Sequence, residues 1–184
     1  MNSKELFARD TTVIKKSDNL FITEVSENWS IGNTANGGYS MTLAAKAMSE
    51  FLDHKDPLSI SAHYLDRVDL GPTELHITHL STSRSLSTAR VEFMQNNKIK
   101  IIFIGTFTDF SFKNDMNIYE REVPNFPDYD TCEVIPYKEG FNPKLDKNIE
   151  KAYSQDSLWW KKNNESSSST LNLYMSWPEK DDID

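Results

Sequence analysis

The chain has 184 residues, with 28 Asp and Glu against 20 Lys and Arg, and a formal net charge of −8. This length suits one domain of ordinary size, or one domain with a tail. The acidic balance argues against a general nucleic-acid or anionic-membrane surface, because both require a basic footprint. A local basic pocket for a phosphorylated ligand is still compatible with this composition.

The cysteine content and the N-terminus bear on the compartment. Cys132 is the only cysteine, so no intrachain disulfide can form, and a reducing environment fits. The opening residues MNSKELFARD carry charges where a signal peptide needs an apolar run, and no stretch has membrane-spanning length. We therefore expect a soluble cytoplasmic protein that does not insert into membranes, in which Cys132 has no nucleophilic role.

Residues 1–11 predict a short helical or loose lead-in. From Thr12 the pattern becomes strand-like, because apolar and polar positions alternate through LFITEV (20–25), and we expect a first strand that ends near Ser26. A loop with an aromatic anchor, Trp29, follows and closes on two adjacent glycines, Gly37 and Gly38.

The helix predicted from about Gly38 to Asp53 is the clearest element. At 100° per residue, one face collects small and apolar side chains and the other collects polar ones. The apolar face is formed by Ser40, Met41, Ala44, Ala47, Met48 and Phe51. Pro57 prevents the helix from continuing much further.

Four strand-like runs at short spacing follow: 59–68, 73–82, 85–95 and 98–110. Asn96 and Asn97 predict a two-residue hairpin turn, since Asn tolerates the left-handed backbone that such a turn needs. The near-continuous apolar run from Ile99 to Phe107 predicts a central strand covered on both faces. One helix followed by four strands is an α+β layout, and an antiparallel sheet curled around that helix would bury its apolar face. This is the layout of a hotdog fold.

The character of the chain changes after Phe110. Residues 111–170 are rich in charge and proline and have no sustained period, so we expect an extended polar linker after a hotdog domain at 12–110. Residues 171–184 begin with a strand-like run.

The region from residue 15 to 110 resembles the N-terminal hotdog of the acyl-CoA thioesterase II-type, double-hotdog thioesterase superfamily. The resemblance rests on a Trp-x-x-Gly loop, a Gly-Gly-aromatic helix entry, a small-His-Tyr-Leu strand, a Gly-Pro turn and an Arg-Ser-x-Ser-Thr-x-Arg-Val…Gln segment. The matching residues are Trp29, Gly32, Asn36, Gly37, Gly38, Tyr39, His63, Tyr64, Leu65, Gly71, Pro72, Arg84, Ser85, Ser87, Thr88, Val91 and Gln95. Ser83 stands where the family usually has glycine.

The resemblance implies hydrolysis of acyl-CoA thioesters to free acid and CoA, and a place in fatty acid metabolism. Members of this family carry two hotdogs in one chain, with the catalytic Asp, Thr and Gln on the second. Those residues have no matching positions here, so the catalytic residues are unknown, and residues 171–184 resemble only the start of a second, truncated hotdog. The resemblance also implies an acyl-CoA substrate and a homodimer or a second hotdog domain as partner.

The helix entry is the first candidate binding site. The N–H groups of Gly37, Gly38 and Tyr39 lie where the helix dipole is positive and could hold an oxyanion, or the glycines could serve only a tight turn. Asn36 could contribute to that site or act as the helix N-cap. Trp29 could cover the core or form a substrate platform.

Other candidates lie further along the chain. His63 could face a ligand from its strand or be a hydrogen-bonded strand histidine, and Arg84 and Arg90 could bind CoA phosphates or be solvated. His76 and His79 are three residues apart, so they face opposite sides of a strand, and we expect no metal site. The resemblance implies no cofactor. Two functions stay open: a thioesterase-like hotdog, or a non-catalytic acyl-CoA-binding or dimerisation module.

Overall fold

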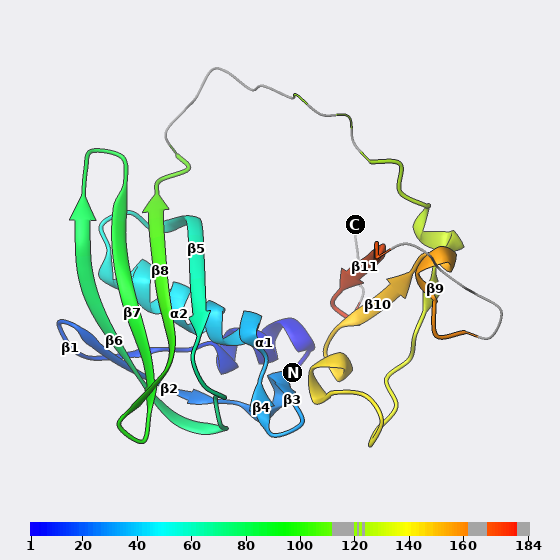
Figure 1. Ribbon diagram of the computed structural model, residues 1–184, viewed down its shortest axis with the longest axis horizontal. Helices are drawn as coiled ribbons and strands as arrows, with labels where there is room; N and C mark the ends of the chain where they lie inside the picture. Colours follow the sequence, from blue (N-terminus) through cyan, green and yellow to red (C-terminus); the bar gives the residue numbers. More distant parts are fainter. Residues whose placement is uncertain (112–119, 121, 123, 162–168, 180–184) are drawn as a thin grey trace.

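The computed structural model describes residues 1–111, 120, 122, 124–161 and 169–179. Its main body is a six-stranded sheet curled around helix α2 (Gly37–Phe51), which is the predicted hotdog fold (Figure 1). The strands follow the order β1-β2-β6-β7-β8-β5 and all pair antiparallel. They are β1 (Ile14–Ser17), β2 (Leu20–Val25), β5 (Asp56–Tyr64), β6 (Gly71–Thr82), β7 (Ser87–Gln95) and β8 (Lys98–Thr108).

The N-terminal lead-in is helical: α1 spans Ser3–Asp10 and is closed by a capping box between Asn2 and Glu5. The predicted strand that ends near Ser26 is confirmed as β2, but the strand-like region that begins at Thr12 is not continuous with it, because β1 and β2 form a hairpin. The turn lies at the polar residues between the two strands, where the Ser17 hydroxyl donates to Asn19 Oδ1 at 3.2 Å.

Alternation along the strands creates the core as predicted. In β7 the side chains of Ala89, Val91 and Phe93 are fully buried, while the intervening ones are only half-buried. The buried positions of β2, β6 and β8 face the same side, so the sheet presents one continuous apolar face to α2. On α2, the buried residues are Tyr39, Ser40, Leu43, Ala44, Ala47 and Met48.

One glycine lets the helix approach the sheet closely. A Cβ at Gly105 on β8 would lie 2.5 Å from the sulfur of Met48, which is fully buried. The absence of a side chain at Gly105 leaves space for Met48. The close approach of α2 to β8 therefore depends on glycine at this position.

Two strand predictions need correction. The run 59–68 was expected to continue to Val68, but β5 ends at Tyr64, because the amides of Leu65 and Asp66 both donate to the carbonyl of Lys100 and turn the chain. β8 lies inside the sheet, yet its outer face is not covered within the described residues, since Ile104 is 38% exposed. The turn at Asn96 and Asn97 is confirmed, with φ of 53° and 59°.

Two small sheets complete the structure. β3 (Ser30–Ile31) and β4 (Thr34–Ala35) pair within the Trp29 loop, while β9 (Glu133–Val134), β10 (Glu150–Tyr153) and β11 (Leu173–Ser176) form an antiparallel sheet. Short 3₁₀ turns occupy Glu27–Trp29, Tyr129–Thr131, Lys144–Lys147 and Gln155–Ser157. The described part of the predicted 111–170 linker thus contains two strands; residues 112–119, 121, 123, 162–168 and 180–184 lie outside the described residues. The division into hotdog, linker and second hotdog stays a prediction.

The β9–β11 sheet and its flanking turns lie beside α1, on the side away from the six-stranded sheet (Figure 1). Trp177 follows β11 directly. The centroid of its ring lies 5.6 Å from that of Phe7 of α1 and 6.3 Å from that of Trp29. Asn148 donates to the carbonyl of Asn28 at 3.1 Å, and Glu179 accepts from the amide of Ser3 at 2.8 Å. These contacts join the C-terminal sheet to α1 and the Trp29 loop.

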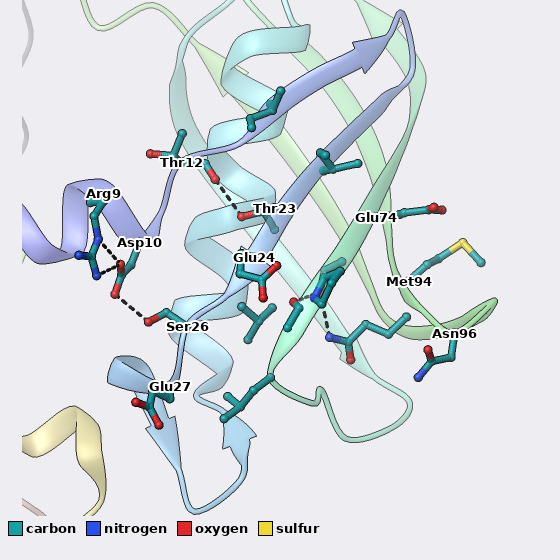
Figure 2. Close-up of a pocket in the computed structure, with 18 of the residues that line it drawn as sticks. Arg9, Asp10, Thr12, Thr23, Glu24, Ser26, Glu27, Glu74, Met94 and Asn96 are labelled. Carbon is teal, nitrogen blue, oxygen red and sulfur yellow. Dashed lines mark hydrogen bonds and ion pairs between the residues drawn. The ribbon is translucent and has the colours of Figure 1, made fainter.

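The carboxylate of Asp10, with a side chain only 5% exposed, ties the end of α1 to the loop that follows β2. Its Oδ2 accepts from Ser26 Oγ at 2.8 Å, from Asn28 Nδ2 at 2.8 Å and from Trp29 Nε1 at 3.2 Å. Its Oδ1 accepts from the guanidinium of Arg9, and Figure 2 shows Arg9 and Ser26 on either side of it. The end of α1 is thereby fixed to the Trp29 loop.

Burial of Asp10 acts to raise its pKa, but the hydrogen bonds from Asn28, Ser26 and Arg9 outweigh it and hold the pKa below its ordinary value. A lowered folded-state pKa means that the charged carboxylate stabilises the fold above the unfolded-state pKa, about 3.9. That contribution is lost as pH falls through the folded-state pKa.

We expect Asp10→Asn to lower the free energy of unfolding at pH 7 by about 2 kcal/mol, because the charge-assisted hydrogen bonds are lost. The difference between wild type and variant should shrink as pH falls below about 4. Urea denaturation across pH measures both. Asp18→Asn is the matched control, since Asp18 is fully exposed and its ion pair with Lys15 is a surface one; equal losses in the two variants would refute the assignment.

Candidate functional site

The first turn of α2 has one uncovered amide rather than three. Asn36 is the N-cap, and its Oδ1 accepts from the amides of Gly38 at 2.9 Å and Tyr39 at 3.2 Å. Among the described residues, no acceptor lies against the amide of Gly37. Of the expected oxyanion donors, only Gly37 therefore remains free to bind a ligand.

Gly37 opens onto a pocket of about 450 Å³. Its walls are the first turn of α2, β4, the end of β5 with the loop that follows it, and Ile101 of β8. Ser40 also lines it, although its hydroxyl is held by the carbonyl of Asn36 at 3.2 Å. The pocket thus combines one free backbone donor with apolar walls, as a small-molecule site requires.

Tyr64 stands directly over Gly37. A Cβ at Gly37 would lie 2.8 Å from the Tyr64 hydroxyl and 3.0 Å from the adjoining ring carbon. The ring of Tyr64 meets that of Phe103 edge to face at 6.4 Å, and 55% of Tyr64 is exposed. Glycine at 37 is therefore what allows a phenol hydroxyl to lie beside the helix entry.

The charged groups at the rim form an ion-pair cluster. Asp66, the only carboxylate among the described lining residues, accepts from Lys98 at 2.8 Å and from Lys100 at 3.1 Å. The hydrogen bonds from Lys98 and Lys100 hold the pKa of Asp66 well below its usual range. Arg67 pairs with Asp69. Asp66 is therefore a poor general base near neutral pH.

Trp29 and Tyr39 lie away from this pocket, in the core. Both are 3% exposed, and the Tyr39 hydroxyl donates to the carbonyl of Asp10 at 2.6 Å while accepting from the amide of Ser26. Burial raises the pKa of Tyr39 to about 12, so it stays a neutral donor. Their side chains hold the loop to α1 and do not line the pocket.

His63 and Arg84 are not brought to Gly37. His63 is exposed on the outer face of β5, opposite Ile102. Arg84 is exposed in the β6–β7 turn, at the end of the sheet where β5 begins, whereas Gly37 lies where β5 ends. Arg90 also faces outward and pairs with Glu92 at 2.8 Å.

The remaining histidines make local hydrogen bonds. His54 Nδ1 lies 2.6 Å from the buried hydroxyl of Ser87, His76 pairs with Glu74, and His79 contacts Thr82. Within the described part of the chain, no three His, Cys, Asp or Glu side chains are grouped as metal ligands would be. No described helix is long and apolar enough to span a membrane.

Part of the hotdog domain matches the sequence profile of a known family. Residues 25–108, from the end of β2 to the end of β8, match the profile of the acyl-CoA thioesterase N-terminal domain. This segment is therefore similar to the acyl-CoA thioesterase N-terminal domain, and its fold is a hotdog fold. No curated protein sequence matches the chain.

Solved structures share this hotdog fold. A thioesterase II candidate from Thermobifida fusca YX has a TM-score of 0.74 at 21% identity, covering 86% of this chain and 59% of that one. A hotdog protein of unknown function from Alicyclobacillus acidocaldarius has a TM-score of 0.79 at 14% identity, over 94% and 62% of the two chains. A thioesterase candidate from Novosphingobium aromaticivorans has a TM-score of 0.70 at 18% identity, covering 90% of this chain and 64% of that one. The chain therefore spans less than two thirds of the length of each.

Sequence reasoning missed the side chains that shape the Gly37 pocket. Tyr64 was noted only as part of the resemblance, and Asp66 and Arg67 belonged to no motif. The Asn-Gly-Gly run did indicate a cap, and a cap that accepts from two amides leaves the first one free. The contact of Tyr64 with Gly37 has no sequence signal, because it joins residues on different elements.

We expect Gly37→Ala to destabilise the protein by about 1 kcal/mol, because the new methyl group displaces Tyr64. In a Tyr64→Ala background the same change should have almost no effect, since the obstructing ring is gone. A double-mutant cycle by urea denaturation measures this coupling. Additive effects of the two substitutions would contradict the contact.

Proposed function

We propose that this chain takes part in the hydrolysis of acyl-CoA thioesters to free acid and CoA, and that its hotdog domain binds the thioester at the Gly37 pocket. The observation that carries the proposal is the uncovered amide of Gly37, at the positive end of α2, in a domain similar to the acyl-CoA thioesterase N-terminal domain.

Thioester hydrolysis passes through a tetrahedral oxyanion, and a fixed backbone donor stabilises the charge that develops there. The Gly37 amide has this character, because α2 holds it rigid and Asn36 occupies the neighbouring amides. Arg67 lines the pocket, and its side chain remains 67% exposed beside Asp69, so its guanidinium can meet a CoA phosphate.

The group that activates water is proposed to come from a second hotdog, in a partner copy or in a further domain. Asp66 is unsuited to that role because Lys98 and Lys100 stabilise its charged form. The same shortage of a base favours the second candidate, a non-catalytic module that binds acyl-CoA or mediates dimerisation.

β5 offers the edge on which a second hotdog could pair. It is the last strand of the six-stranded sheet, and Leu58, Tyr64 and Leu65 at or beside it are more than half exposed. An exposed apolar edge strand invites pairing with another chain. We propose a homodimer through β5, or an equivalent contact with a second hotdog that begins at residues 171–184.

The proposed setting is fatty acid metabolism in the cytoplasm. It rests on the acyl-CoA chemistry of the family and on the single cysteine, which suits a reducing compartment.

A panel of acyl-CoAs of different chain length, followed by release of free thiol, tests the activity. We expect turnover by the wild type and a loss of about a hundredfold in Gly37→Pro relative to Gly37→Ala. Both variants add a Cβ beside Tyr64, but only proline removes the N–H, and proline is tolerated at the first helical position.

Equal turnover in the two variants would remove the oxyanion role from Gly37. If no acyl-CoA is hydrolysed while a non-hydrolysable analogue binds, this chain by itself is an acyl-CoA-binding module that does not catalyse the reaction.

The dimer is tested by sedimentation at several concentrations. We expect Leu58→Lys to weaken self-association by about tenfold, because an apolar side chain of the interface is replaced by a charge. Leu80→Lys is the control, since Leu80 is 48% exposed on β6, away from the β5 edge. A wild type that stays monomeric at every concentration would exclude the homodimer.

A further inference from the structure

A second and larger hollow lies at the β2 side of the sheet and shares no residue with the Gly37 pocket. Its volume is about 1070 Å³. It is enclosed by the end of α1, by β1 and β2, by the start of β6 and by the β7–β8 turn. In Figure 2, Glu24 stands between Asp10 on one side and the pair Glu74 and Met94 on the other.

The floor and walls of this groove include exposed and half-buried apolar side chains. Ile14 is 53% exposed at the β1 edge, and Leu70 is 36% exposed at the turn into β6. Ile22, Pro72 and Met94 complete the apolar surface. Because β1 is the free edge of the sheet, the groove is open along that side.

The polar rim is acidic. Glu24 and Glu74 project from neighbouring strands, and within the described residues Glu24 has neither an ion-pair nor a hydrogen-bond partner. Glu74 lies 2.7 Å from His76 Nε2, but its side chain remains 55% exposed. Glu27 pairs with Lys144, and its side chain remains 60% exposed. Arg9 is the only basic residue in the described lining, and its guanidinium is engaged by Asp10.

This charge decides what the groove can hold. Carboxylates repel the phosphates of CoA, so the groove is not a second acyl-CoA site. The groove is open along the β1 edge, so an extended chain can lie in it. An extended polypeptide whose aliphatic side chains meet Ile14, Ile22 and Met94, and whose cations meet Glu24 and Glu74, satisfies both the shape and the charge.

We propose that this groove docks a segment of a partner protein in which lysine or arginine alternates with aliphatic residues. The interaction is independent of thioester chemistry, since the groove and the Gly37 pocket have separate walls. The protein could thereby be held near a basic partner while the Gly37 pocket stays open to substrate.

The probe is a short fluorescein-labelled peptide in which lysine and leucine alternate, measured by fluorescence anisotropy against the full chain. We expect saturable binding that weakens with added salt. Glu24→Gln combined with Glu74→Gln should weaken it by about fivefold, as expected for the loss of two exposed charge pairs. Glu24→Gln alone should weaken binding by a smaller factor, and Glu50→Gln is its matched single-charge control, because Glu50 is exposed on α2 outside the groove.

A peptide that alternates glutamate with leucine should bind more weakly, because its charges repel those of the groove. A peptide that alternates lysine with serine should also bind more weakly, because it lacks the aliphatic side chains. Failure of the lysine–leucine peptide to bind, or equal binding to the double variant and wild type, would overturn the proposal. So would displacement of the peptide by spermidine at equal affinity, which would identify the occupant as a small polyamine.

Discussion

The carboxylate of Asp10 is the interaction on which the rest of the structure depends. A buried charge is unfavourable unless donors surround it, and here the donors come from the Trp29 loop and from Arg9. The backbone of the same residue receives the Tyr39 hydroxyl from the first turn of α2. One residue thus fixes α1, the loop and the helix entry relative to one another.

This arrangement explains two residues of the Trp-x-x-Gly and Gly-Gly-aromatic motifs without reference to substrate. Trp29 and Tyr39 are a donor pair with large apolar bodies, so they can close the core and satisfy Asp10 together. Because Tyr39 is anchored, the Asn36 cap and the neighbouring Gly37 amide are held at a defined place. The position of the Gly37 amide therefore depends on the hydrogen bond between Tyr39 and Asp10, which lies outside the pocket.

The fold was predictable from the sequence because burial alternates along β2, β6 and β7 and follows a helical period along α2. The Asn96–Asn97 turn was equally clear, since it depends on local backbone preference alone. The β1–β2 turn was missed, although Asp18 and Asn19 favour a turn, because the strand-like runs before and after them indicate a single strand.

The candidate site was only partly predictable. Gly37 follows from the Asn-Gly-Gly run, but the positions of His63 and Arg84 relative to it depend on the register between strands, which a single sequence does not encode. The contact of Tyr64 with Gly37 and the pairing of β10 with β11 likewise join distant segments. Periodicity indicates which side chains are buried; it does not indicate what they touch.

The position of α1 has a consequence for the order in which the chain folds. Ser3 bonds to Glu179 across 176 positions of sequence, and Phe7 packs on Trp177. Contacts between residues so far apart in the sequence form against a large loop-closure entropy, so they stabilise the fold only late in folding. The six-stranded sheet can assemble from neighbouring hairpins, but α1 completes its packing only after the segment around Trp177 has left the ribosome. During synthesis, one side of Phe7 and Trp29 therefore stays open to solvent, and this aromatic surface is where a nascent chain would need protection.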